Sequence, residues 1–353
     1  MKKHTLSALA ISIAVLFTAC TTATDQKDVK NSTPSVDKTD ATNDFYDNET
    51  THLLPLEMIV VDGETSGTFE IKLDELPLRS VIVKETRWTP DSNKFVGAYR
   101  YDGTSLYDIL NNCPLLKKNA EKFNPIIDAY VEVSNDKGEK VVFSWGEIFY
   151  PIHRHEIIIG TQVMHIVPSK SKDMWPLPEE ARIIAGTDLL TERNISNPTK
   201  ITIRSLDKDF VVNRELNPMI AESFGVYKDE KEILRYNELP EGDMADYPNI
   251  FYGRGRGIHA VTPFEGVILR DVFENYFENT PQALKTGMFT IVAADGYRSA
   301  FTYNEIMNRN DQSEVIIMDE GMNDGGRFHL YTAGDFFSDR AIKSVTGIWY
   351  QEL

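Results

Sequence analysis

The residues best suited to bind a charged ligand lie in a short glycine-rich segment of the second half of the chain. Residues 252–261 read YGRGRGIHAV, in which Arg254 and Arg256 alternate with glycines and His259 follows. Glycines allow a backbone to approach a ligand closely, and arginines bind oxyanions through two parallel hydrogen bonds. The pattern predicts an anion- or ligand-binding loop, with a solvated surface loop as the alternative.

Two further arginines recur in a phrase that the chain spells twice. Residues 185–203 read AGTDLLTERNISNPTKITI and residues 333–348 read AGDFFSDRAIKSVTGI, which aligns Arg193 with Arg340. An acid precedes each arginine by five residues, Asp188 in the first phrase and Asp335 in the second. An ion pair within each repeat is therefore one expected role for these arginines.

Other patterns for chemistry are weak or missing. His153 and His155 form a His-x-His pair, but no third ligand accompanies them, so we expect no metal site. The sequence contains no Ser-His-Asp motif, no phosphate-binding loop and no paired-cysteine zinc pattern. We accordingly assign no catalytic residue.

The doubled phrase belongs to a longer duplication. DELP at residues 74–77 recurs as NELP at 237–240, and YDGTSLYDIL at 101–110 recurs as FEGVILRDVF at 264–273. DKGEKVVFSWGEI likewise matches ADGYRSAFTYNEI, which aligns Phe143 with Phe301. Four matches in the same order indicate a tandem repeat with altered loop lengths.

Each repeat shows the same series of expected elements. Alternating apolar runs broken by Lys-Gly or Asp-Gly predict β-hairpins at residues 129–145 and 288–303. Helical spacing predicts short helices in SLYDIL and VILRDVF and again in WGEIFY and YNEIMN. The runs HEIIIG, EVIIMD, TKITI and TGIWY are typical of strands. We expect a mixed α/β or α+β unit, repeated once.

This order of elements resembles the sulfite-oxidase-like molybdopterin-binding domain. The resemblance rests on the ELP-like turn, the helix motif, the hairpin and the closing phrases RNISNPTKI and RAIKSVTGI. It implies an α+β fold of two tandem molybdopterin-binding-like domains, residues 52–207 and 208–353. In that family a basic residue near the closing phrase helps to hold the pterin phosphate, which implies a ligand-binding role for Arg193 and Arg340.

The resemblance does not extend to the metal ligand of that family, a cysteine thiolate on the strand after the ELP-like turn. The matching stretches, residues 79–88 and 243–257, contain no cysteine, and Cys113 lies after the expected helix instead. Carboxylates and hydroxyls are poor substitutes for a soft thiolate. We therefore expect no bound cofactor, and molybdopterin only if the metal is coordinated in an atypical way.

The N-terminus predicts export and a lipid anchor. Residues 1–19 combine Lys2 and Lys3 with a short apolar run, and the sequence FTAC ends at Cys20. This resembles a bacterial lipoprotein signal in which Cys20 becomes the lipidated first residue. No twin-arginine pair precedes Cys20, whereas cofactor-loaded molybdenum enzymes use such a signal for folded export. Residues 20–51 then read as a polar tether.

Composition and charge complete the expected function. The chain has 353 residues and a formal net charge of −17, which disfavours binding to nucleic acid. We expect a protein of the cell envelope, anchored to a bacterial membrane and facing the periplasm or the exterior. Its expected role is non-catalytic binding of a small anionic ligand or an envelope protein. The alternative is a molybdopterin-dependent oxidoreductase with atypical metal coordination.

Overall fold

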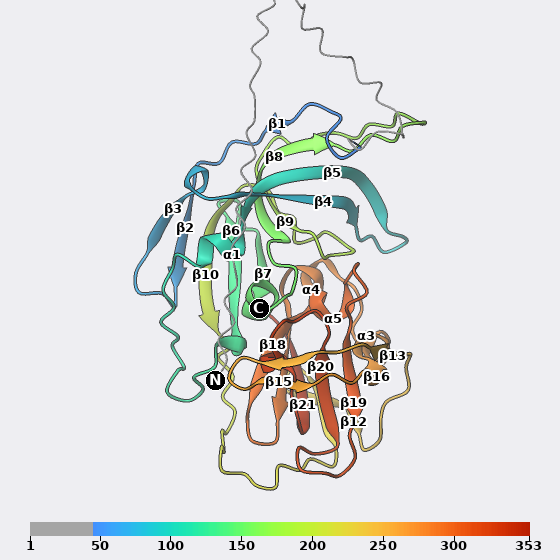
Figure 1. The fold of residues 1–353 in the computed structure, drawn as a ribbon. Helices are drawn as coiled ribbons and strands as arrows, with labels where there is room; N and C mark the ends of the chain where they lie inside the picture. The colour runs from blue at the N-terminus through green and yellow to red at the C-terminus, as the bar shows by residue number, and fades with distance from the viewer. Residues whose placement is uncertain (1–44) are drawn as a thin grey trace, which may run out of the picture. The chain divides into compact units, whose positions relative to one another are not determined.

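Strands dominate the computed structural model of the protein, which describes residues 45–353. Twenty-one strands occur in this range, whereas its five α-helices have only five or six residues each. The expectation of an α+β fold with two molybdopterin-binding-like domains is therefore wrong. The described chain is a mostly β structure with four main sheets (Figure 1). The predicted signal peptide, Cys20 and most of the predicted tether lie outside the described residues.

The first half of the described chain forms two five-stranded sheets. One has the order β1-β8-β5-β4 with β9 paired to β8, and the other has the order β3-β2-β10-β6-β7. Their strands are β1 (His52–Leu53), β2 (Met58–Gly63), β3 (Phe69–Lys72), β4 (Leu78–Arg87), β5 (Lys94–Ser105), β6 (Ala129–Asn135), β7 (Lys140–Ser144), β8 (Ile157–His165), β9 (Arg182–Ala185) and β10 (Pro198–Ser205).

The second half forms one five-stranded and one four-stranded sheet. Their orders are β12-β11-β21-β17-β18 and β13-β16-β19-β20, and a separate hairpin joins β14 to β15. The strands are β11 (Phe224–Lys228), β12 (Lys231–Tyr236), β13 (Met244–Tyr247), β14 (Phe251–Gly253), β15 (Gly257–Ala260), β16 (Phe264–Ile268), β17 (Gly287–Ala293), β18 (Arg298–Thr302), β19 (Val315–Asp319), β20 (Phe328–Thr332) and β21 (Val345–Glu352).

The two halves share one strand topology. The order β3-β2-β10-β6-β7 in the first half corresponds to β12-β11-β21-β17-β18 in the second, and β4-β5-β8-β9 corresponds to β13-β16-β19-β20. The last strand of each half also runs parallel to an early strand, β10 to β2 and β21 to β11. The β14-β15 hairpin lies between β13 and β16 and has no counterpart strand pair between β4 and β5. The same pairings thus occur twice within one compact unit.

Short helices and turns connect these strands. The helices are α1 (Leu106–Leu110), α2 (Trp145–Phe149), α3 (Leu269–Phe273), α4 (Pro281–Thr286) and α5 (Tyr303–Met307), and 3-10 turns occur at Leu73–Glu75, Ile126–Asp128 and Ser338–Arg340. Within residues 45–353, no helix has the length and apolar character needed to cross a membrane. The predicted hairpins correspond to β6-β7 and β17-β18, and these predictions are confirmed.

Each half has its own apolar core between its two sheets. In the first half, Ile59 and Val131 of one sheet pack in the same cluster as Ile159 and Ile183 of the other. In the second half, a cluster of the same kind unites Phe289 and Ile348 with Ile317 and other residues. Because burial of apolar surface is the main stabilising term of folding, each half holds its loops on a firm framework.

Candidate functional site

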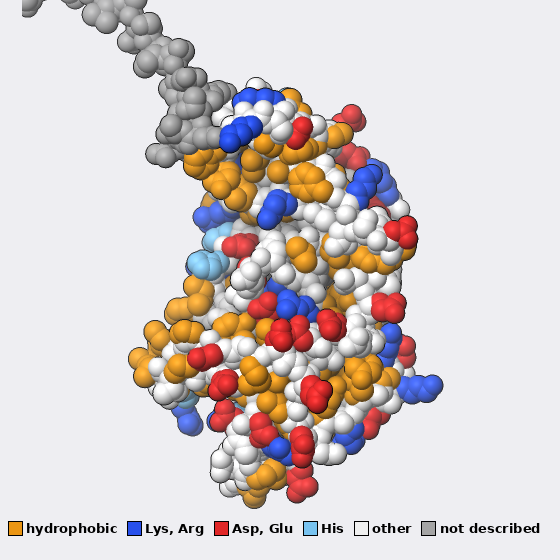
Figure 2. Space-filling model, turned by 90° about the vertical axis from the view of Figure 1, so that its right-hand side faces the viewer, with side chains coloured by type: hydrophobic (Ala, Val, Ile, Leu, Met, Phe, Trp, Pro, Cys, Tyr) orange, Lys and Arg blue, Asp and Glu red, His pale blue; other side chains and the backbone are white. Residues whose placement is uncertain are grey.

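The candidate site is a cleft of about 270 Å³ lined by residues of both halves. The first half contributes α2, the segment before β8 and Thr187, and the second contributes α5, the segment before β19 and the loop after β20. Figure 2 shows one face of the molecule, on which histidine side chains lie beside an acidic one and acidic and basic side chains gather in a cluster. Clefts between packed units are common places for ligands to bind.

Reciprocal backbone hydrogen bonds hold the two walls of the cleft together. After α2, the Ile152 N–H donates to the Gly334 carbonyl at 2.9 Å, and the Phe336 N–H donates to the Tyr150 carbonyl at 2.8 Å. After α5, the Leu189 N–H donates to the Asn308 carbonyl at 2.8 Å in the same manner. The repeated phrase of the first half, residues 185–203, therefore pairs with the residues after α5, and that of the second half, residues 333–348, pairs with the residues after α2. This exchange gives a structural reason for the repeated phrase.

Arg193 lies in the middle of the first phrase, and its guanidinium is bound by two carboxylates. Its guanidinium donates to both oxygens of Asp188, the shorter contact at 2.6 Å, and to both oxygens of Glu147 at 2.9 and 3.0 Å. The Phe143 ring lies 4.3 Å from the guanidinium carbon. The side chain is 1% exposed. The structure thus gives Arg193 the ion-pair role that the sequence left open, and leaves it no free edge for an external anion.

Arg340 occupies the matching place in the second half. It donates to both oxygens of Asp335 at 2.7 Å and to Glu305 at 2.5 Å, and its guanidinium carbon lies 4.6 Å from the Phe301 ring. Its side chain is also buried, although it lines the cleft. An arginine held by two carboxylates at such distances is poorly placed to bind a further anion.

Glu147 and Glu305 lie in the first turn of the two matching helices, α2 and α5. Each accepts the backbone N–H of its own N-cap residue, Ser144 or Thr302, whose hydroxyl accepts the glutamate N–H in return. These capping boxes satisfy backbone donors that a helix start would leave unpaired. The sequence signals, SWGE and TYNE, fit the Ser/Thr-x-x-Glu pattern but were not recognised as marking the site.

The two arginine clusters together carry an excess of negative charge. Glu147, Asp188, Glu305 and Asp335 are four buried carboxylates that face only two guanidinium groups. Burial raises the pKa of Glu147 to about 7, and the nearby charge of Glu305 acts in the same direction against the pull of Arg193. The Arg309–Asp311 pair at the rim is neutral as a whole. The cleft therefore favours a positively charged ligand over an anion.

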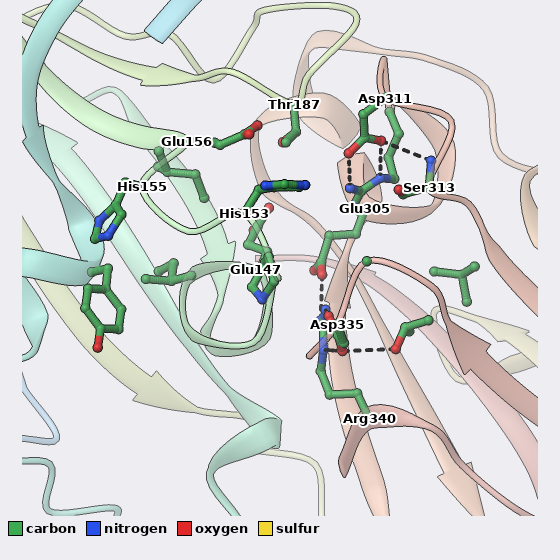
Figure 3. A pocket seen from close by; sticks show the side chains of 18 residues that line it. Glu147, His153, His155, Glu156, Thr187, Glu305, Asp311, Ser313, Asp335 and Arg340 are labelled. Carbon is green, nitrogen blue, oxygen red and sulfur yellow. Dashed lines mark hydrogen bonds and ion pairs between the residues drawn. The ribbon is translucent and has the colours of Figure 1, made fainter. Parts of the chain in front are cut away.

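Four polar side chains in the cleft form no direct hydrogen bond or ion pair within residues 45–353. The Glu156 carboxylate, the His153 imidazole and the hydroxyls of Thr187 and Ser313 line the cleft and form no side-chain hydrogen bond or ion pair with any described residue. Burial and repulsion from Asp311 raise the pKa of Glu156, against the attraction of His153 and Arg309. Figure 3 shows these groups around the opening between the two walls. Glu156 was not singled out from the sequence, because a lone acid before an apolar strand carries no pattern.

His155 points to the other side of its segment and takes part in a separate network. Its Nδ1 lies 2.9 Å from the Ser105 hydroxyl and 3.5 Å from Asp108, which in turn accepts from Arg79 at 2.9 Å. A catalytic triad places hydroxyl and carboxylate on opposite ring nitrogens, whereas both face Nδ1 here. Ser105 is also fully buried as the N-cap residue of α1. This network is structural and does not form an activated nucleophile.

The residues of the glycine-rich segment lie elsewhere. They form the β14-β15 hairpin, in which Arg254 pairs with Asp339 at 2.8 Å and Arg256 is exposed without a partner among the described residues. His259 lines a different hollow of about 270 Å³ with Lys343. The structure does not gather the five predicted ligand residues, since Arg193 and Arg340 are buried near the cleft and the hairpin residues are not among its lining.

The donor set offers no fit for molybdenum. Cys113, the one cysteine within residues 45–353, is 4% exposed in the first core and donates to the Ile109 carbonyl at 3.7 Å. It does not line the cleft. Among the described residues, no three His, Cys, Asp or Glu side chains are grouped so as to hold a metal ion. Besides its arginines, the polar groups of the cleft are carboxylates, imidazole and hydroxyls, and none of them replaces the soft thiolate ligand of the family that the sequence resembles.

Comparisons with known proteins do not assign the chain to a family. No family model matches it, and no curated protein matches it. Among solved structures, the sulfane dehydrogenase SoxCD from Paracoccus pantotrophus aligns over 85% of this chain and 85% of its own, at 8% identity and a TM-score of 0.27. A TM-score this low does not establish a common fold, and nothing is concluded from it about this chain.

Proposed function

We propose that the protein is a non-catalytic binding protein whose cleft takes a small polar ligand carrying a positively charged amine. The observation that carries the proposal is the unpaired, half-buried carboxylate of Glu156 inside a cleft with excess negative charge. A partly desolvated carboxylate without a hydrogen bond is costly, and a ligand ammonium group would supply the missing hydrogen bonds. The hydroxyls of Thr187 and Ser313 add acceptors and donors for the remaining polar atoms of such a ligand.

The pairing of the arginines argues for a cation and against the anionic ligand expected from the sequence. Arg193 and Arg340 are saturated by carboxylates, and Arg309 is held by Asp311. No hydroxyl that lines the cleft bonds to His153 among the described residues: Thr187 and Ser313 form no side-chain hydrogen bond, and Thr332 donates to Asp335, a carboxylate already held by Arg340. Binding without chemistry is the role that this set of groups supports best.

The place of action proposed here rests on the sequence. Lipidation at Cys20 would hold the protein on a bacterial membrane, facing the periplasm or the exterior, with the polar segment before the folded part as a spacer. An exported binding protein on such an anchor would meet small extracellular solutes. The alternative of a molybdopterin-dependent oxidoreductase gains no support from the donor set of the cleft.

Isothermal titration of the full-length protein with small charged and neutral solutes tests the proposal. We expect ethanolamine and glucosamine to bind, and acetate and glucose to bind far more weakly. Because a hydrogen bond to a charged group contributes about 1.5–3 kcal/mol, Glu156→Gln should weaken amine binding roughly ten- to a hundredfold. Glu179→Gln makes the same change at an exposed glutamate outside the cleft and should leave binding unchanged.

Two results would contradict the proposal. One is tighter binding of acetate than of the amines, since this would place an accessible cation in the cleft. The other is unchanged amine affinity in Glu156→Gln, which would locate the amine elsewhere on the protein.

A further inference from the structure

A second groove, of about 480 Å³, adjoins the cleft on the outer side of the Glu156 segment. Five consecutive residues of β4, from Leu78 to Ile82, form one wall. The opposite wall is the segment of Arg154, His155 and Glu156, and Gly186 closes the groove between them. A wall made of consecutive residues in one strand means that the groove follows the strand instead of crossing it.

The β4 strand is open along this groove. It pairs with β5 on one side, and no described strand pairs with it on the other. Only its far end is covered, where the Thr191 N–H donates to the Thr86 carbonyl at 2.8 Å. An open edge presents backbone donors and acceptors to an added strand. Leu78 and Ile82 beside it are 55% and 49% exposed, so apolar side chains of a guest could pack there.

The groove also contains a cation that has no ion-pair partner. The guanidinium carbon of Arg154 lies 4.5 Å from the Tyr107 ring, and no described carboxylate pairs with it. Stacking on a ring leaves the N–H edge of a guanidinium free for an anion. Arg79, by contrast, is already held by Asp108. Arg154 is therefore the one groove cation that can take a carboxylate without losing an existing partner.

The groove and the cleft lie against the same segment of the chain. His155 and Glu156 line both, so the segment between them forms a common wall. The segment of Arg154, His155 and Glu156 thus has one guanidinium and one carboxylate without an ion-pair partner among the described residues, and the edge strand β4 forms the opposite wall of the groove. A zwitterionic, extended ligand matches these three features at once.

We propose that the cleft and the β4 groove together bind a short peptide with free termini, its ammonium group at Glu156, its backbone along β4 and its carboxylate at Arg154. The proposal rests on the proposed function, because it identifies the amine in the cleft as a peptide N-terminus. Strands rise about 3.3 Å per residue, so the five β4 residues match a guest of roughly four or five residues. Backbone pairing would make the site tolerant of peptide sequence, with the termini fixing length and direction.

Calorimetric titration with a pentapeptide of alternating valine and threonine tests this inference on the full-length protein. We expect it to bind at least about tenfold more tightly than ethanolamine. Capping the N-terminus with acetyl or the C-terminus with an amide should each weaken binding about tenfold or more. N-methylation should weaken binding at every second residue only, because alternate N–H groups of an added strand face its partner.

Variants of the protein identify the two ends of the site. Arg154→Ala should weaken binding of the free peptide but not of the amidated one. Glu156→Gln should weaken binding of the free peptide but not of the acetylated one. Arg256→Ala removes an exposed arginine outside both hollows and serves as the control.

The outcomes separate the two proposals. If ethanolamine binds through Glu156 but the peptide binds no more tightly, the peptide inference is wrong and the amine site stands. If N-methylation has no alternating effect, or if Arg154→Ala weakens free and amidated peptides equally, strand pairing or the carboxylate contact is refuted. If neither amine nor peptide binds, both proposals are wrong.

Discussion

At the scale of single residues, the two buried arginines show how a repeated residue can be structural. Arg193 and Arg340 each hold an acid five positions earlier and the capping glutamate of the adjacent helix. Each also lies against a phenylalanine at a matching position, Phe143 or Phe301. Recurrence in both halves is what a framework role requires, whereas a ligand site would need only one copy.

We expect Arg340→Ala to destabilise the protein by about 3–5 kcal/mol, the usual cost of leaving buried charges without their partner. The change leaves the buried carboxylates of Asp335 and Glu305 without their guanidinium partner. Arg256→Ala, at an exposed position, should shift the free energy of unfolding by less than about 0.5 kcal/mol. Urea denaturation followed by tryptophan fluorescence and circular dichroism measures both, and equal losses in the two variants would refute the framework role.

At the scale of elements, α2 illustrates how the halves fit against each other. It has five residues, begins at a capping box and places Gly146 against the second half. A Cβ added at this position would overlap the Arg340 guanidinium and its Cδ. The matching position of α5 is Asn304, whose side chain donates to the Leu284 carbonyl at 2.7 Å. The two helices therefore share their caps but differ in what they pack against.

Gly146→Ala should destabilise the protein even though alanine is the better helix former. The propensity gain is about 1 kcal/mol, but displacing Arg340 from its carboxylates should cost more, for a net loss of about 1–3 kcal/mol. Gly67→Ala is the matched control, since a Cβ there meets no atom within 4 Å. Thermal unfolding compares the two variants. A higher melting temperature for Gly146→Ala would show that the Arg340 side chain can move aside without loss of stability.

Most individual strands and helices could be predicted from the sequence, but the fold class that they build could not. The hairpins follow from turn residues between alternating apolar runs, and β8, β10, β19 and β21 follow from β-branched runs. The helical motifs also gave helices, yet α1 covers only LYDIL, because the preceding Gly-Thr-Ser continues β5. Helices of five residues cannot form a layer, which is why an α+β fold was the wrong expectation.

At the scale of the whole molecule, the site depends on contacts that local patterns do not encode. The repeat can be recognised in the sequence. The backbone hydrogen bonds from Ile152 to Gly334 and from Leu189 to Asn308, however, depend on how the two halves pack. The alternation of arginine and glycine in the β14-β15 hairpin predicts a ligand-binding loop, but the arginines do not line the cleft. Glu156 gained its importance only from what surrounds it, because an isolated glutamate is ordinarily a solvated surface residue.

The packing of the halves also predicts an unusual dependence of stability on pH. The pKa of Glu147 is raised by burial from 4.5 to about 7 in the folded protein. Between these pH values the folded protein retains a proton on Glu147 that the unfolded chain releases. The contribution of Glu147 to the free energy of unfolding is therefore greatest below pH 4.5 and declines as the pH rises toward 7. The shift corresponds to a loss of about 3 kcal/mol. Paired carboxylates with lowered pKa, such as Asp62 and Asp108, have the opposite effect at more acidic pH.

Glu147→Gln isolates this contribution, since a glutamine cannot titrate and retains the size of the protonated acid. The free energy of unfolding of the wild type minus that of the variant should fall by about 3 kcal/mol between pH 4.5 and 7 and level off above pH 8, where both states of the wild type are ionised. For Glu179→Gln, at an exposed site, the free energy of unfolding should follow that of the wild type over the whole pH range. A difference that stays level between pH 4.5 and 7 and rises with pH only below pH 4.5 would mean that Arg193 holds Glu147 ionised in the folded protein, and that the four carboxylates do not strain the junction between the halves.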